Sequence, residues 1–358
     1  MVPLYTCVKR GWINKWIEWV VASGGIPHHE PLPTFLPYLA IMKQFLVRRL
    51  IALIPTLLGI SIIVFAVMHL IPGDTITAMI GTQFKLTETQ AAALREYYGL
   101  DKPLPEQFGR WILATVQGDL GYSVRKGEPV LPLILRHFPL TLELALFAML
   151  IAVALGVPLG ILSAIKRDSA IDLAGRVFAL IGLAMPNFWL GTLIILVLSL
   201  YFQIMPNAGN YVDFFTDPIA NLKQMVFPAI TLGFAASADI LRMVRSSMLE
   251  ELAEDYVRTA RSKGLAERAV ILKHCLKNAL IPVITIVGLE TGYLFGGAVI
   301  VESVFALPGI GRLLLDGIGE RDYAVVQGTI LFIAFNFVLV NLLTDLAYSW
   351  VNPRIRYD

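Results

Sequence analysis

Few residues in this chain have the types and the spacing that catalysis or metal binding requires. His28, His29 and Glu30 are adjacent, whereas metal ligands that share one helix face recur at positions i and i+4. The two cysteines, Cys7 and Cys275, lie far apart in the sequence and have no metal-ligand spacing. We therefore predict no metal site and no disulfide framework.

Nucleotide-binding and hydrolase motifs do not occur either. The sequence contains no G-x-x-x-x-G-K-[ST] phosphate loop, no G-x-S-x-G and no H-E-x-x-H. Gly309-Ile310-Gly311 lacks the third glycine and the preceding strand of a dinucleotide fingerprint, so it is better read as a turn. Ser61 and His69 share an apolar run, but no third partner can be assigned to them. We predict no catalytic residue and no cofactor, which argues against an enzyme.

The most polar part of the chain is the island Glu250–Pro282, which lies between two long apolar runs. Glu254 and Arg258 have the spacing of a surface ion pair, and Gly264 is suited to ending a helix with positive φ. A second amphipathic segment, Ala266–Lys277, follows. Two helices joined by a glycine turn indicate a docking platform for another protein, and an ordinary amphipathic loop is the plainer alternative. The first helix is predicted from apolar residues that share one face: Leu249, Leu252, Ala253, Tyr256, Val257 and Ala260.

Composition places this island in a membrane protein. Hydrophobic residues make up 56% of the chain and charged residues 16%, and the mean hydropathy is +0.69. These values lie well outside the usual range of soluble domains. The net charge of +2 is small, and basic residues are not interleaved with aromatic ones, so nucleic acid is not a predicted partner. The predicted fold class is an all-α membrane protein.

Six apolar segments are long enough for the ~20 residues that a hydrocarbon core requires. The fourth segment contains Asp239, and a charge near a helix centre costs about 2.5–3.5 kcal/mol on insertion scales. Arg242, one helical turn later, could neutralise that carboxylate. The predicted spans are Phe45–Ile71, Leu140–Ile165, Leu173–Phe202, Val226–Val244, Ala279–Val304 and Val325–Val351.

The distribution of Lys and Arg predicts the orientation of these spans. Basic residues flank the first span at Lys43, Arg48 and Arg49, and eight Lys and Arg residues lie between Arg242 and Lys277. The loop Pro72–Pro139 has balanced charge. We therefore predict that this loop is extracytoplasmic, and that the island and both termini are cytoplasmic.

The loop Pro72–Pro139 is too long to be a simple connection. Leu86–Tyr98 has a helical pattern, with Thr87 as an N-cap and Gly99 beyond its end, and Gln107–Val116 has another. A small helical cap on the outer face would fit a surface that receives another protein. The alternative is a solvated loop with local structure.

Residues 1–42 are the least membrane-like part and form an N-terminal extension. Trp12, Trp16 and Trp19 lie at positions that suit a short interfacial helix, whereas the prolines from Pro27 to Pro37 disfavour helix through the next stretch. A second interpretation also stays open, in which Met42 is the natural start.

From residue 43 onward the chain resembles the permease subunits of bacterial ATP-binding-cassette importers for dipeptides, oligopeptides and nickel. The resemblance rests on a set of short segments in order. They are Val47–Leu50 leading to Ile54-Pro55-Thr56, Leu70–Asp74, Tyr98–Leu104, Gly118–Gly121, Asp255–Leu265, Asn278–Pro282, Pro308–Arg312, Arg321–Tyr323 and Asn352–Arg356.

In that family the polar island is the "EAA" loop, whose helices sit in a groove of the ATPase subunit. Arg258-Thr259-Ala260 stands here where the general pattern has Glu-Ala-Ala, and Gly264 matches the glycine. The resemblance implies that Tyr256, Ala260 and Gly264 seat in the ATPase, with Arg258 and Arg261 at the rim. The coupling loop spans residues 250–278.

The resemblance also implies the partners. They are a second, homologous permease in a heterodimer, two ATPase subunits, an extracytoplasmic substrate-binding protein and the lipid bilayer of the bacterial cytoplasmic (inner) membrane. ATP hydrolysis belongs to the ATPase subunits. The implied cargo is peptides, with glutathione and nickel chelates as alternatives within the family. A secondary transporter is the rival of another class, but no repeat between the two halves supports it.

Two further sets of residues are candidates for roles in transport. Glu290 lies near the middle of the fifth span, and an intramembrane carboxylate is a functional-site hypothesis by default. It could line the translocation pathway and favour cationic groups such as a peptide amine, or it could be protonated or paired structurally. Pro308, Gly309 and Gly311 are candidates for an outer turn that closes the mouth of the pathway.

Overall fold

The computed structural model describes residues 35–70, 89, 95–96, 99–123, 125–206 and 211–351, without the side chains of residues 35–46, 48, 50 and 348–351. The chain divides into two compact units, residues 1–50 with 357–358, and residues 51–356. The fold and the sites below belong to the second unit. The predicted N-terminal interfacial helix lies outside the described residues.

The described part of the chain is almost entirely helical. Its single β-hairpin pairs β1 (Tyr122–Ser123) antiparallel with β2 (Glu128–Pro129). The α-helices are α2 (Phe35–Leu70), α5 (Leu104–Val116), α6 (Val130–Ile165), α7 (Ala170–Ala184), α8 (Asn187–Phe202), α9 (Pro218–Leu252), α10 (Asp255–Ser262), α11 (Glu267–Ala269), α12 (Leu276–Val304), α13 (Ile310–Glu320) and α14 (Tyr323–Val351), and the π-helix η1 (Val270–Cys275) joins α11 to α12.

Five of these helical stretches are long and apolar enough to cross a membrane, and α7 with α8 makes a sixth if the bent pair is one span. The all-helical membrane fold is thus confirmed. The prediction of one unbroken third span differs from the structure, because α7 and α8 meet at 103°. Pro186 explains the break: proline forces the preceding residue out of the α region, and Met185 is extended (φ −92°, ψ 114°).

Side-chain caps fix where two of the core helices begin. Ser169 precedes α7, and its hydroxyl accepts a hydrogen bond from the Asp172 amide. Asp217 precedes α9, and its Oδ1 accepts from the amides of Ile219 and Ala220 at 3.0 and 3.1 Å. Such oxygens satisfy amides that have no partner within the helix.

The centre of the fold is the close packing of α6 against α9. A Cβ atom at Gly160 would lie 2.7 Å from Cβ of Val244, and one at Gly233 would lie 2.4 Å from the Ala148 carbonyl oxygen. Small residues let helix backbones approach closely in membranes. Leu144 of α6 and Ile240 of α9 are fully buried in the same core.

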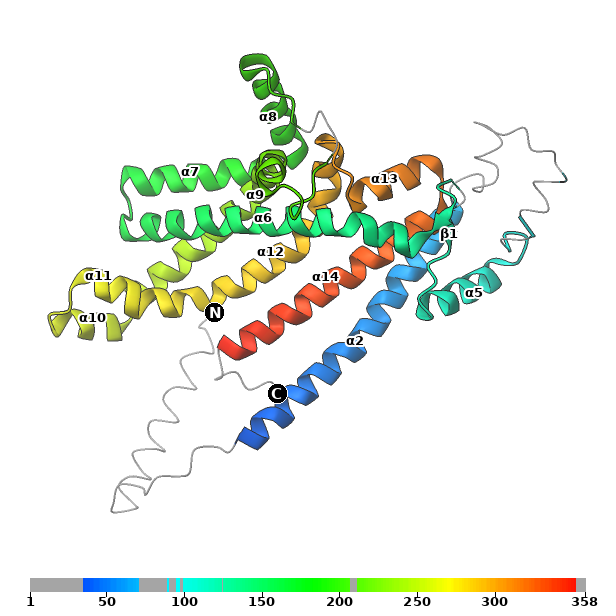
Figure 1. The fold of residues 1–358 in the computed structure, drawn as a ribbon. Helices are drawn as coiled ribbons and strands as arrows, with labels where there is room; N and C mark the ends of the chain where they lie inside the picture. The colour runs from blue at the N-terminus through cyan, green and yellow to red at the C-terminus, as the bar shows by residue number, and fades with distance from the viewer. Residues whose placement is uncertain are drawn as a thin grey trace. The chain divides into compact units, whose positions relative to one another are not determined.

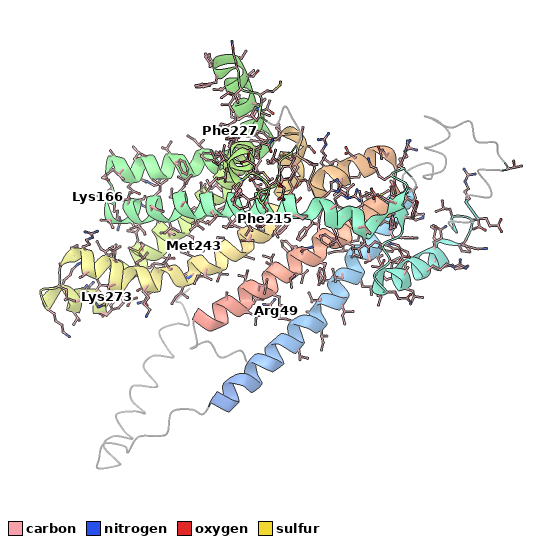
Figure 2. The ribbon with its side chains drawn as sticks, in the orientation of Figure 1. Arg49, Lys166, Phe215, Phe227, Met243 and Lys273 are labelled. Atoms are coloured by element: carbon pink, nitrogen blue, oxygen red, sulfur yellow. The ribbon has the colours of Figure 1, made fainter. Side chains whose placement is uncertain are left out.

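The two ends of the long helices carry different structures. Figure 1 shows the α10–α11 hairpin and the α6–α7 turn at one end, and β1 and α13 at the other. Lys166, directly after α6, and Lys273, within η1, lie at the first of these ends (Figure 2). We call the first end the hairpin end and the second the β1 end.

The β1 end contains one of the two helices predicted in the long loop. The helix predicted at Gln107–Val116 is present as α5, which begins three residues earlier because Pro103 and Pro105 suit a helix start. The helix predicted at Leu86–Tyr98 lies outside the described residues, apart from a few helical positions. The β1–β2 hairpin was not predicted, since two-residue strands leave no periodic pattern.

Candidate functional site

The polar island forms a helical hairpin, but its first helix is not continuous with α9. The helix predicted through Leu249–Ala260 breaks at Ala253 and Glu254. Glu254 is extended (φ −69°, ψ 149°), and its carbonyl oxygen accepts from the amides of Val257 and Arg258 at 3.1 and 3.4 Å. The chain therefore restarts as a separate helix, α10, which can take a different direction from α9.

Gly264 ends α10 in the way that its sequence predicts. Its φ is +76°, a conformation that residues with a Cβ adopt at a cost. The Leu265 amide donates to the Ala260 carbonyl at 3.4 Å, and the Gly264 amide donates to the Arg261 carbonyl at 2.9 Å. These two bonds define a Schellman motif, so the turn between α10 and α11 has a fixed geometry.

Tyr256 connects three helices at the base of the hairpin. Its hydroxyl donates a hydrogen bond to Glu251 near the end of α9, and the Asn278 amide of α12 donates to the same hydroxyl at 3.1 Å. The pKa of Tyr256 is raised to about 12, mainly by burial and next by the hydrogen bond to Glu251. The phenol therefore stays protonated, and keeps both bonds, at physiological pH.

The two arginines of α10 have different surroundings. Arg261 donates two hydrogen bonds to Glu267, at 2.6 and 3.1 Å, and so ties α10 to α11 across the glycine turn. Arg258 pairs with Asp255 at 3.3 Å rather than with the predicted Glu254, and its side chain is 74% exposed. Arg258 thus faces outward, whereas Arg261 also holds the hairpin together.

The apolar stripe of α10 faces the chain's own core. Val257 is fully buried and Ala260 is 7% exposed, in the cluster that contains Val270 and Cys275 of η1. Ala260 therefore lies in the same core as η1, and its seating in the ATPase stays a prediction. Leu265 is 42% exposed at the glycine turn, and sequence reasoning missed it because it lies outside the helical stripe.

Glu290 is half-buried on α12, in the middle of a membrane-spanning helix. Within the described part of the chain it makes no ion pair, and the nearby charge that acts on it is the Asp239 carboxylate of α9. Asp239 pairs with Arg242 at 2.9 Å, as predicted. Two acidic side chains from neighbouring helices thus interact here, and Arg242 pairs with one of them.

The turn that contains Pro308, Gly309 and Gly311 is built around a buried carboxylate, Glu302. This side chain is fully buried, accepts a 2.5 Å hydrogen bond from the Thr141 hydroxyl, and accepts from the amides of Gly311 and Arg312 at 2.8 and 3.1 Å. Glu302 therefore occupies the N-terminus of α13, where helix amides and the helix dipole favour an anion. A Cβ atom on Gly309 would lie 2.2 Å from the Glu302 carboxyl carbon, so this turn requires glycine.

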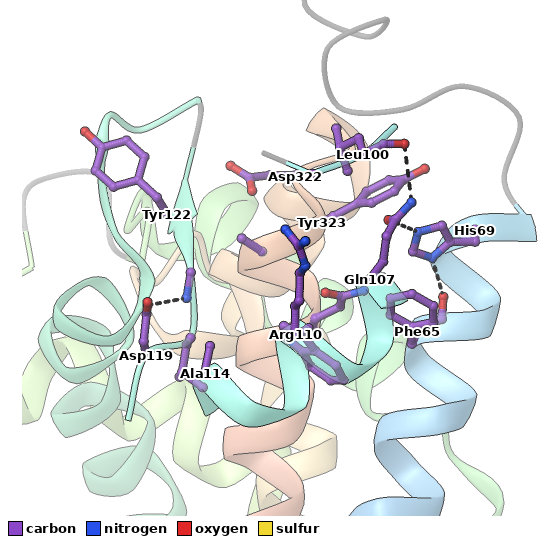
Figure 3. Close-up of a pocket in the computed structure, with 16 residues that line it drawn as sticks. Phe65, His69, Leu100, Gln107, Arg110, Ala114, Asp119, Tyr122, Asp322 and Tyr323 are labelled. Atoms are coloured by element: carbon purple, nitrogen blue, oxygen red, sulfur yellow. Dashed lines mark hydrogen bonds between the residues drawn. The ribbon is translucent and has the colours of Figure 1, made fainter. Parts of the chain in front are cut away.

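A pocket of about 330 Å³ lies at the same end, between α2, α5, β1 and the start of α14. Figure 3 shows Gln107 beside His69, whose Nε2 lies 3.2 Å from the Gln107 Oε1, while the Gln107 amide group donates to the carbonyls of Leu100 and Lys102. The lining also includes Asp322, which accepts a 2.6 Å hydrogen bond from Ser123 of β1. These contacts hold α5 against the end of α2, and the β1–β2 hairpin against the start of α14.

The hairpin end and the β1 end both lie within segments that match a known protein family. A family described as the inner membrane component of binding-protein-dependent transport systems matches residues 156–357, and the N-terminal part of such membrane components matches residues 42–145. The chain belongs to this family. It is therefore the permease component of such a transporter, and ATP hydrolysis resides in separate subunits.

The similarity between this permease and its relatives extends over nearly the whole length of each relative. It is 42% identical over 341 residues to the dipeptide transport system permease protein DppB of Escherichia coli, covering 88% of this chain and 99% of that protein. It is 42% identical over 339 residues to the di/tripeptide permease of Pseudomonas aeruginosa, and 41% over 319 residues to the glutathione permease GsiC of Pectobacterium atrosepticum, with 88% of this chain and all of each relative covered.

The fold of the permease also matches a solved transporter. A chain of the inward-facing MetNI methionine ABC transporter superposes with a TM-score of 0.51 at 18% identity, covering 62% of this chain and 96% of that chain. At this identity the match shows the fold alone. The resemblance inferred from the sequence is thus confirmed, and the permease is a multi-pass protein of a bacterial inner-membrane transporter.

Proposed function

We propose that this permease forms half of the translocation pathway of an ATP-driven dipeptide importer. A second, homologous permease supplies the other half, two ATPase subunits bind the hairpin end, and an extracytoplasmic binding protein delivers substrate to the β1 end. Both termini are cytoplasmic in this arrangement. The supporting observation is the hairpin itself, which Tyr256 and Arg261 hold rigidly against α9, α11 and α12.

A coupling element must be stiff and must present a surface of its own. The buried Ala260 and the Schellman turn at Gly264 provide the stiffness. The surface consists of Tyr256, Arg258, Arg261 and Leu265, all at least partly exposed. When the ATPase pair closes on ATP, it displaces this surface, and the attached helices move as packed bodies in a hinge-and-shear rearrangement.

Glu290 is our candidate for the pathway lining. Glu290 is half-buried on α12 and interacts with Asp239 of α9, so two acidic side chains lie in this region, and Arg242 pairs with Asp239. It would attract the protonated amine of a peptide. Glu290→Gln should weaken uptake of radiolabelled dialanine and change its pH dependence, whereas unchanged affinity and an unchanged pH profile would exclude the role.

Glutathione is a second candidate cargo, because glutathione permeases are about as similar to this chain as the dipeptide permeases are. Nickel chelates remain an alternative from the sequence resemblance. Unlabelled glutathione or a nickel chelate can be added as a competitor during dialanine uptake. A compound that the permease also transports should reduce dialanine uptake, and a compound that it does not transport should leave this uptake unchanged.

Pro308, Gly309 and Gly311 are our candidates for an outer gate. Their turn connects α12 to α13, and the buried Glu302 carboxylate holds it. A gate built in this way moves together with the end of α12. Crosslinking the turn to the second permease should block uptake, and unaffected uptake after complete crosslinking would exclude a gate.

Purification in mild detergent with mass spectrometry tests the proposed assembly. The wild-type permease should bring along an ATPase and a second permease. Leu265→Asp places a charge on the exposed turn without disturbing the buried face of α10, and should release the ATPase while keeping the second permease. Arg167→Gln, in the exposed α6–α7 turn, is the matched control and should retain both. Recovery of the wild-type chain alone would contradict the proposal.

A further inference from the structure

A buried charge cluster lies at the hairpin end, apart from the hairpin. Asp172, in the first turn of α7, is fully buried. Arg245 of α9 donates two hydrogen bonds to its two carboxylate oxygens, from Nε at 2.7 Å and from Nη2 at 2.9 Å. Arg is suited to this planar two-point contact, which also fixes the relative orientation of the two side chains.

The Asp172 carboxylate accepts two further hydrogen bonds, one from the end of α6 and one from the α6–α7 turn. The Ser163 hydroxyl of α6 donates to one oxygen at 2.5 Å, and the Asp168 amide donates to the other at 3.1 Å. Arg176, one turn further along α7, lies 3.6 Å away. One side chain therefore joins α6, α7 and α9.

Close packing extends this junction along all three helices. A Cβ atom at Gly160 of α6 would lie 2.7 Å from Val244 Cβ, and one at Gly182 of α7 would lie 2.7 Å from Ala238 Cβ, both on α9. Gly175 of α7 approaches Ser163 of α6. These contacts leave little room for the helices to slide, and the buried ion pair holds their register at the hairpin end.

The same stretch of α9 leads directly to the proposed docking hairpin. Arg245 lies within two turns of the end of α9 at Leu252, and α10 begins at Asp255. Between them Met248 is fully buried, in the core that also contains Val257 of α10. A displacement of α10 therefore reaches the Asp172–Arg245 pair through a short, packed segment.

We propose that Asp172 and Arg245 are positioning residues that form a coupling clamp, making the α6–α7 turn follow α9 when the hairpin moves. This inference rests on the proposed function. A buried ion pair is weak evidence for net stability, and fixing register is its best-attested use, which suits a clamp. Without it, α9 would respond to the ATPase while α6 and α7 lagged behind, so that ATP would be hydrolysed without productive transport.

The test uses the complete transporter, co-expressed with its partners and reconstituted in liposomes, with radiolabelled dialanine as the probe. ATP hydrolysis, dialanine uptake and the amount of ATPase in the complex are measured together. Asp172→Asn removes the charge. Arg245→Lys keeps the charge but loses the two-point contact, and so preserves the fold better. Arg167→Gln is the control, because Arg167 is exposed in the same turn.

We expect both clamp variants to retain the ATPase and its hydrolysis, while dialanine transported per ATP falls about tenfold, a typical size for a coupling between sites. A double variant that exchanges the two residues, Asp172→Arg together with Arg245→Asp, should recover part of this loss. An unchanged ratio in Arg245→Lys, or a parallel fall of uptake and hydrolysis, would overturn the clamp while leaving docking intact. Absence of the ATPase from the wild-type complex would instead overturn the proposed function, and the clamp with it.

Discussion

The Ser123 hydroxyl donates a 2.6 Å hydrogen bond to the Asp322 carboxylate, across 199 positions of sequence. Both residues are buried. Asp322 also accepts from the Val325 amide at 3.3 Å and so caps the start of α14. One carboxylate therefore positions the β1–β2 hairpin and a membrane-spanning helix together, at the end of the molecule where the binding protein is proposed to dock.

Replacing Ser123 by Ala should destabilise the permease, because Asp322 would keep its burial and lose a donor. A hydrogen bond to a buried charged group is worth about 1.5–3 kcal/mol. The measurement is the thermal unfolding midpoint in detergent. Ser303→Ala is the control, since the Ser303 hydroxyl is exposed and donates to the Val299 carbonyl of its own helix. Equal midpoints for the two variants would contradict the expected difference.

Gly309→Ala should destabilise the turn between α12 and α13. Its new Cβ would lie 2.2–2.3 Å from the carboxylate atoms of the fully buried Glu302, and overpacking of this kind costs about 1–3 kcal/mol. Gly319→Ala, within the helix α13 that follows this turn, meets nothing within 4 Å and should raise the unfolding midpoint, because Ala favours helix over Gly by about 1 kcal/mol. We therefore expect the unfolding midpoint to fall in Gly309→Ala and to rise in Gly319→Ala. An unchanged midpoint in Gly309→Ala would argue against the tight packing of Gly309 on the Glu302 carboxylate.

Gly288→Ala tests the close approach of α12 to α14. The added Cβ would lie 1.9 Å from Thr344 Cγ2, whereas a Cβ at Gly296 of the same helix meets nothing within 4 Å. We expect Gly288→Ala to destabilise by about 1–3 kcal/mol and Gly296→Ala to be neutral or stabilising. Adding Thr344→Ala should recover part of the loss. No recovery in that double variant would show that this contact is not the cause.

Tyr256→Phe should lower stability in a way that depends on pH. The folded protein raises the pKa of Tyr256 from 10.0 to about 12, so the folded state holds the phenol proton more tightly than the unfolded state does. This contribution is fully present below pH 10 and is lost as the pH rises through about 12. The difference in unfolding midpoint between wild type and Tyr256→Phe should therefore shrink over that range, and a constant difference would exclude the hydrogen-bonded phenol as its source.

The sequence predicted the positions of the helices better than their breaks. Long apolar runs locate the spans because the hydrocarbon core demands a minimum length, and the glycine turn at Gly264 follows from local backbone chemistry. The bend at Met185 could have been predicted from Pro186, but the apolar run continues through it and hides the signal. The restart of α10 at Glu254 has no comparable marker, since the apolar stripe continues across it.

Contacts between distant parts of the chain were beyond sequence reasoning. The pairing of Asp172 with Arg245 joins residues 73 positions apart, and no pattern in either helix indicates the other. Ala260 illustrates a subtler limit: helical periodicity identifies an apolar face, but not whether that face packs on the same chain or on a partner. Ala260 is buried in the core of its own chain, whereas Arg258 and Leu265 are exposed, and the docking role of all three stays a prediction.

The most direct test of the proposed function is uptake of radiolabelled dialanine into liposomes that contain the permease pair and the ATPase, with the binding protein outside. We expect uptake only when ATP is present on the ATPase side and the binding protein is supplied, and no uptake in response to a proton or sodium gradient. ATP-independent uptake by this chain alone, driven by such a gradient, would contradict the importer mechanism and favour a secondary transporter.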